Sequence, residues 1–225
     1  TDEKNTRIYV QTGMQTTSED ALKNAQALSQ IVKEPVGVIV NGTQGLPKDV
    51  EEYLPKAPTI KDALNEYTYQ TLNKNDPKLI VLHSAGNEDA KKALQLGQQL
   101  GHEYNNLSFL SLASPVSNST LQTFTNSTNA NYLGQVNDWR DPVTYSKTAA
   151  IGVIGGGLVG VGLAGVGLFT LNPALLYSGG SIAAGAAGAA GAAGYGIQNI
   201  HPLDNYLTKP QTQSIMFDWK AKQKK

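Results

Sequence analysis

The feature that most constrains this chain is a long stretch without charge. From Thr148 to Leu203 no side chain carries a formal charge at neutral pH, and most of the residues are Gly, Ala, Val and Leu. A helix that meets water on one face normally carries Lys, Glu or Asp on that face. We therefore expect this apolar stretch either to pack inside protein or to meet lipid.

The apolar stretch divides at Pro173 into two segments of helical length. The first, 149–171, is about long enough to cross the core of a bilayer, and the second, 174–197, repeats Gly at three-residue spacing. Each Gly costs roughly 1 kcal/mol relative to Ala in a helix, so such helices need a packing partner. We predict an apolar helical hairpin over 148–199 that is buried in protein or inserted in a membrane, with a disordered linker as the remaining alternative.

Composition excludes several classes of function. Eighteen Lys and Arg balance eighteen Asp and Glu, and the sequence contains no Gly-rich phosphate loop and no His-x-x-x-His pair. The chain has no Cys, which excludes disulfides and thiolate catalysis. We predict no metal, no cofactor and no nucleic-acid partner, and we expect the Lys-rich C-terminus to be a solvated tail.

Apolar runs alternate with amphipathic segments along the first 147 residues. We predict strands at 7–10, 36–42, 79–82, 108–115 and 131–136, and helices at 18–32, at 59–72 with Thr59 as its cap, and from the turn at residue 84 to Gly101. This alternation predicts an α/β fold with a mostly parallel sheet and helices on both faces. The predicted organisation is an α/β core at 1–147, the apolar insert at 148–199, and a return to the core at 200–225.

One serine lies where a predicted strand meets a predicted helix. The segment His83-Ser84-Ala85-Gly86 follows the strand that ends at Leu82. A serine on such a turn projects its hydroxyl above the sheet, at the positive end of the helix. Ala85 and Gly86 are small, as close passage of strand and helix requires, although Leu82 occupies the position where a glycine is usual. We predict Ser84 as a nucleophile.

A serine hydroxyl needs an imidazole to accept its proton. The chain has three histidines. His83 is adjacent to the serine and should point to the opposite face of the sheet, and His102 follows a helix C-terminus. His201 lies in a late loop that can approach the carboxyl edge of the sheet. We predict His201 as the base, with a structural loop histidine as the alternative.

Two aspartates follow the last predicted strand, which ends at Val136. Pro142 holds Asp141 in an extended conformation that projects its side chain from the loop, whereas Asp138 could pair with Arg140 or cap a turn. We favour Asp141 as the carboxylate that orients the imidazole, and Asp138 is the alternative.

The negative oxygen of an acyl-transfer intermediate needs two preorganised donors. The N–H of Ala85, next to the serine, is one candidate. The loop after the first strand should supply the second, from Gly13 or Met14. A tight turn is the alternative reason for Gly13.

Several segments together resemble a known family. IYVQTGMQTTSEDALKNA, VIVNGTQG, LIVLHSAGNEDAKKALQ, FLSLASPVS, NDWRDPVT and HPLDNYL resemble, in this order, α/β-hydrolase domains at the C-terminal ends of large bacterial secreted proteins of the haemagglutinin and polymorphic-toxin type. The resemblance covers 7–147 and 200–207. It implies a secreted lipase or phospholipase with Ser84 as nucleophile, Asp141 as acid and His201 as base, and an immunity protein as a partner.

The apolar stretch lies between the predicted acid and base, where many hydrolases of this fold carry a lid. Exposing apolar surface to water costs roughly 25 cal/mol per Å², so such a lid favours a membrane surface. We predict hydrolysis of carboxylesters in membrane lipid through an acyl-serine intermediate. The alternatives are a non-enzymatic, membrane-inserting or pore-forming toxin domain, and a soluble peptidase or thioesterase whose insert is structural.

Overall fold

The computed structural model describes residues 6–12, 18–39, 58–74, 76–138, 141 and 202–223. The chain forms two compact units, one of 1–137 together with 203–225 and one of 138–202. The fold below is that of the first unit. The predicted hairpin over 148–199 lies outside the described residues.

The first unit contains a five-stranded, all-parallel sheet, which confirms the predicted α/β fold. The strands are β1 (Ile8–Gln11), β2 (Val36–Ile39), β3 (Lys78–His83), β4 (Leu107–Leu112) and β5 (Asn131–Val136). Their order across the sheet is β2-β1-β3-β4-β5, so β3 occupies the centre. Each strand corresponds to one of the five predicted apolar runs.

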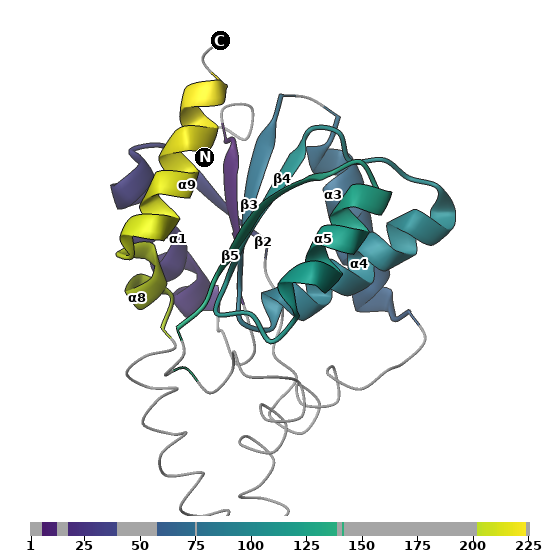
Figure 1. The fold of residues 1–225 in the computed structure, drawn as a ribbon, viewed down its shortest axis with the longest axis horizontal. Helices are drawn as coiled ribbons and strands as arrows, with labels where there is room; N and C mark the ends of the chain where they lie inside the picture. Colours follow the sequence, from purple (N-terminus) through teal and green to yellow (C-terminus); the bar gives the residue numbers. More distant parts are fainter. Residues whose placement is uncertain are drawn as a thin grey trace, which may run out of the picture. The chain divides into compact units, whose positions relative to one another are not determined.

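Helices cover both faces of this sheet (Figure 1). The described helices are α1 (Ser18–Val32), α3 (Ile60–Leu72), α4 (Gly86–Leu100), α5 (Asn118–Ser127), α8 (Leu203–Leu207) and α9 (Pro210–Lys222). One face carries α1, α8 and α9, and the other carries α3, α4 and α5. This layering follows from parallel connections, because each crossover must lay a helix on one face of the sheet.

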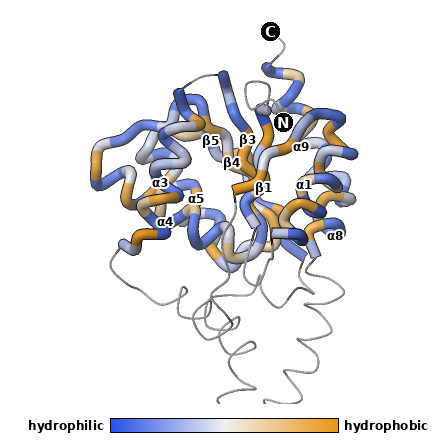
Figure 2. Tube along the Cα trace, turned by 180° about the vertical axis from the view of Figure 1, so that it is seen from behind, coloured by the Kyte–Doolittle hydropathy of each residue, from blue (hydrophilic) through white to orange (hydrophobic). Residues whose placement is uncertain are grey.

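Strand side chains alternate between two apolar cores. Val10 and Val81 pack on the side of α1, α8 and α9, whereas Tyr9, Ile80 and Phe109 pack on the side of α3 and α4. Figure 2 shows apolar colour along the strands and mixed colour along the surrounding helices. Because both faces of the sheet are covered, the strands are continuous apolar runs rather than alternating ones.

Two helix ends confirm predictions from the sequence. The Thr59 hydroxyl oxygen accepts from the N–H of Asp62 at 3.2 Å, and the Asp62 carboxylate accepts from the N–H of Thr59 at 2.8 Å. This reciprocal cap satisfies donors at the start of α3 that have no partner within the helix. Gly101 ends α4 with φ 73°, in the left-handed region that glycine adopts without strain.

The C-terminal segment differs from its prediction as a solvated tail. Residues 203–207 and 210–222 are helical, and Tyr206, Met216 and Trp219 are buried in the core beneath α1. Lys220 Nζ lies 2.8 Å from Glu34 Oε1. The tail was misjudged because its lysines suggested solvent, while its few apolar side chains find their partners only in the folded sheet.

Candidate functional site

The carboxyl ends of the strands form the edge where this fold can bind a ligand. From β1 the chain runs to β2 on one side and then to β3 on the other, so the strand order reverses between β1 and β3. In open parallel sheets ligands bind outside the carboxyl ends of the strands at such a reversal. Ser84 follows β3 directly and Thr12 follows β1, so both residues flank this position.

Ser84 forms the sharp turn between β3 and α4 that the sequence predicts. Its φ is 56°, which places a non-glycine residue in the left-handed region. Its N–H donates to the carbonyl of Leu112 at 3.2 Å, and the residue is 6% exposed. Left-handed backbone costs an L-residue about 1–2 kcal/mol, and such strain persists mostly at functional positions.

Asn87, in the first turn of α4, holds this turn from below. Its Nδ2 donates to the carbonyl of Ser84 at 2.9 Å and to that of Leu112 at 3.1 Å. Sequence reasoning missed Asn87. The available signal was a short amide side chain three residues after the serine, because Asn readily hydrogen-bonds to nearby backbone.

Gly86 allows α4 to begin directly beside the end of β1. A Cβ at position 86 would lie 2.5 Å from the carbonyl oxygen of Gln11 and 3.2 Å from that of Thr12. Neither obstacle can rotate away, since both are backbone. The predicted need for a small residue after the serine therefore has a specific cause: the helix start and the loop after β1 are in contact.

Gly86→Ala is expected to destabilise the fold by about 1–3 kcal/mol, because a side chain here overpacks against backbone. Urea unfolding measures the change. Gly101→Ala at the other end of α4 is the matched control, since a Cβ there meets nothing within 4 Å and adds only the strain of its positive φ. A loss for Gly86→Ala no larger than that of the control would contradict the close contact.

The other predicted site residues fall into three groups. Ala85 is buried at the N-cap of α4, and no described residue accepts a hydrogen bond from its N–H, as is usual for the first donors of a helix. Asp138 and Asp141 belong to the second unit, where both are buried and the N–H of Asp141 donates to the carbonyl of Asp138 at 3.0 Å. The three remaining predicted residues lie outside the described residues: His201, Gly13 and Met14.

The two other histidines have structural surroundings. His83 is buried, and its ring meets that of Tyr206 edge-on with centroids 6.1 Å apart, on the face covered by α8. His102 follows α4, and its Nδ1 lies 2.8 Å from Glu66 Oε1 on α3. Sequence reasoning did not identify this pairing, which joins residues 36 positions apart.

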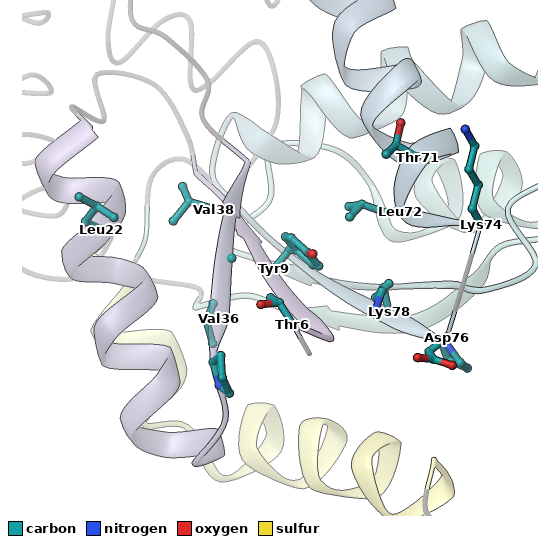
Figure 3. Close-up of a pocket in the computed structure, with 13 residues that line it drawn as sticks. Thr6, Tyr9, Leu22, Val36, Val38, Thr71, Leu72, Lys74, Asp76 and Lys78 are labelled. Atoms are coloured by element: carbon teal, nitrogen blue, oxygen red, sulfur yellow. The ribbon is translucent and has the colours of Figure 1, made fainter. Parts of the chain in front are cut away.

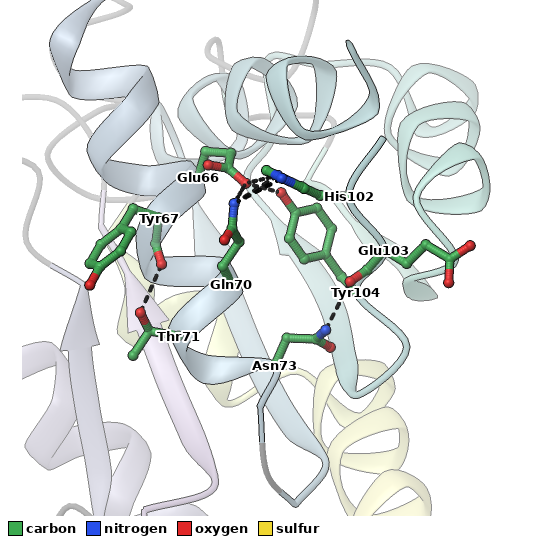
Figure 4. Close-up of polar contacts among 8 residues, drawn as sticks. All are labelled: Glu66, Tyr67, Gln70, Thr71, Asn73, His102, Glu103 and Tyr104. Atoms are coloured by element: carbon green, nitrogen blue, oxygen red, sulfur yellow. Dashed lines mark hydrogen bonds and ion pairs between the residues drawn. The ribbon is translucent and has the colours of Figure 1, made fainter. Parts of the chain in front are cut away.

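Glu66 is the centre of a polar cluster between α3 and the segment after α4 (Figure 4). Its Oε1 accepts from Tyr104 Oη at 2.7 Å, from Gln70 Nε2 at 2.6 Å and from His102 Nδ1 at 2.8 Å. Burial opposes ionisation, but these hydrogen bonds outweigh it and lower the pKa of Glu66. Burial, followed by the bond to Glu66, raises the pKa of Tyr104, so its hydroxyl stays a donor.

Glu66→Gln is expected to weaken the acid dependence of stability. Because the folded state lowers the pKa of Glu66 below its ordinary value of 4.5, the charged cluster contributes fully above that pH and loses its contribution as the pH falls through the lowered pKa. Urea midpoints between pH 6 and pH 3 measure this. Glu19→Gln, at a side chain 79% exposed, is the control and should keep the wild-type dependence. Equal acid dependence in all three proteins would contradict the role of Glu66.

A cavity of about 1110 Å³ lies beside the edge strand β2 (Figure 3). Residues that precede β1, β2 and β3 contribute to its wall, among them Thr6, Pro35 and Pro77. It therefore extends toward the amino end of the sheet. None of the residues predicted for catalysis lines it.

Two further searches cover only the part of the chain that the structure describes. No group of three His, Cys, Asp or Glu side chains there could hold a metal ion. No helix there is long and apolar enough to span a membrane.

Comparison with known proteins identifies no relative. No protein-family model, no curated protein and no solved structure matches the chain. The reasons for assigning a function to it therefore come from its own residues and geometry.

Proposed function

We propose that this chain is a serine hydrolase that cleaves carboxylesters of membrane lipid through an acyl-serine intermediate. The observation that carries the proposal is the strained backbone of Ser84, a non-glycine residue at φ 56° between the central strand β3 and α4. A turn of this kind presents a hydroxyl at the carboxyl edge, next to the helix N-terminus. No described residue hydrogen-bonds to the Ser84 hydroxyl, so the described part of the fold does not use it for structure.

In the proposed reaction, Ser84 Oγ attacks the ester carbonyl carbon while His201 accepts the hydroxyl proton. The new C–O bond forms, the C–O bond to the alcohol breaks, and the proton passes from His201 to the departing alkoxide. Water then attacks the acyl-serine in the same manner and releases a fatty acid. Asp141, or Asp138, orients the imidazole and stabilises its charge. Both aspartates follow β5, whose carboxyl end lies at the same sheet edge as Ser84.

The N–H of Ala85 and a donor from Gly13 or Met14 would stabilise the tetrahedral oxyanion. Two observations support this pairing. The N–H of Ala85 has no described acceptor, and the carbonyl of Thr12, directly before Gly13, lies beside Gly86. The loop after β1 thus starts next to the helix end that carries Ala85.

The lipid substrate is inferred from the apolar stretch. It separates the proposed acid from the proposed base along the chain, and it contains no charge from Thr148 to Leu203. Apolar surface of this kind gains free energy at a bilayer, which would bring the site to esters at the membrane surface.

A fluorophosphonate probe tests the proposal directly, because it phosphonylates activated serines. The full chain should be labelled on Ser84, as identified by mass spectrometry of the modified peptide, and phospholipid vesicles should accelerate the labelling. Absence of labelling, or labelling confined to another serine, would contradict the proposal. Labelling at Ser84 without any effect of vesicles would contradict the lipid substrate and favour a soluble ester or peptide.

A further inference from the structure

We infer that Asn87 is a positioning residue that holds the Ser84 turn in its strained, reactive conformation. The inference rests on the proposed function, because it assigns Asn87 a role in the reactivity of Ser84. Asn87 is fully buried, so it is placed to act through the turn rather than by touching substrate.

The side-chain amide of Asn87 ties the turn to the neighbouring strand β4. Nδ2 uses both of its hydrogens, one toward the carbonyl of Ser84 at 2.9 Å and one toward that of Leu112 at 3.1 Å. The Leu112 carbonyl also accepts the N–H of Ser84 at 3.2 Å. The peptide groups on both sides of the Ser84 Cα are therefore held by one cluster, which restricts the rotations that would relax φ.

Ser111 fixes the orientation of this amide. Its Oγ donates to Asn87 Oδ1 at 2.6 Å, and Ser111 is fully buried. Because Oδ1 is held by a donor, Nδ2 must face the two carbonyls. An aspartate of the same shape would place an oxygen against both carbonyls, so only the amide satisfies all three partners.

The same geometry predicts which kinetic quantity changes. The N–H of Ala85 and the hydroxyl of Ser84 both extend from the turn that Asn87 holds, so a relaxed turn would displace the nucleophile and an oxyanion donor together. Substrate binding surfaces would stay intact. Loss of Asn87 should therefore lower the rate of reaction at Ser84 and leave the affinity of the probe unchanged.

The test measures the inactivation rate constant and the binding constant of the fluorophosphonate probe for the full chain and its variants. Asn87→Ala and Asn87→Asp should lower the rate constant about 10- to 100-fold, the scale of a nucleophile displaced by about 1 Å. Ser111→Ala, which keeps the amide but releases its orientation, should show a smaller decrease. The binding constant should stay within about twofold of wild type.

Asn73→Ala is the matched control at the opposite edge of the sheet. Asn73 also joins two backbone segments, since its Nδ2 donates to the carbonyl of Glu103 at 2.8 Å and its Oδ1 accepts from the N–H of Asn106 at 2.8 Å. A comparable loss of stability without loss of labelling rate is expected. If Asn87→Ala does not fold, Ser111→Ala and the control still provide the comparison.

The outcomes separate the two proposals. Labelling of Asn87→Ala or Ser111→Ala at the wild-type rate would overturn the positioning role and leave the hydrolase proposal intact. A parallel decrease in the Asn73→Ala control would also overturn it, because the effect would then follow stability alone. Absence of labelling in the wild-type protein would overturn both.

Discussion

Ser84→Ala is expected to lower kcat for phospholipid hydrolysis about 10⁶-fold, because removal of the nucleophile leaves only binding and oxyanion stabilisation. Release of fatty acid from phospholipid vesicles measures the effect. The substitution should leave the fold intact, since the Ser84 backbone makes the turn contacts and its hydroxyl bonds to no described residue. Ser114→Ala is the matched control.

Ser114 lies just after β4, and its buried hydroxyl donates to the carbonyl of Val116 at 2.9 Å. Its loss should cost some stability without loss of hydrolysis. Equal fatty-acid release by wild type and Ser84→Ala would eliminate Ser84 as the nucleophile.

Leakage of vesicle contents separates lipid hydrolysis from the non-enzymatic alternative. Hydrolysis predicts that Ser84→Ala abolishes leakage. Leakage that persists in Ser84→Ala but disappears when residues 149–196 are deleted would favour insertion of the apolar stretch itself.

Trp219→Ala is expected to destabilise the fold by about 3–5 kcal/mol, the largest stability change predicted here. The indole is 2% exposed, and its Nε1 donates to Ser108 Oγ at 3.0 Å, 111 residues away in sequence. The substitution removes a large buried side chain and leaves a cavity against β4. Chemical denaturation measures the loss.

Phe217→Ala is the control, because Phe217 lies on the same helix and is 45% exposed. It should cost less than about 1 kcal/mol. Equal losses in the two variants would contradict the docking of α9 on the sheet.

Local signals predicted much of the first unit. The five strands, the Thr59 cap and the glycine that ends α4 were recognisable because each depends on residues within a few positions of one another. The segments α5, α8 and α9 were not recognised as helices. In α5, for example, Leu121 and Phe124 are surrounded by Ser, Thr and Asn, which have weak helix propensity, so packing against the sheet decides its conformation.

The candidate site shows the same division. Ser84 and Gly86 were predictable because a strand, a serine, a glycine and a helix are consecutive, and the structure adds the positive φ and the contact with Gln11. Asn87 and Ser111 were not predictable, because 24 residues separate them in sequence and their hydrogen bond exists only once β3 and β4 are paired.

By itself, the sequence determined the parallel α/β fold, the turn at Ser84 and the absence of charge in the apolar stretch, since periodicity, turn residues and composition are local properties of the chain. Only the tertiary structure decided the burial of α9, the ionised Glu66 cluster and the amide that holds the Ser84 turn. Each of these depends on contacts between distant segments, whose hydrogen bonds and burial arise when the sheet and its helices assemble.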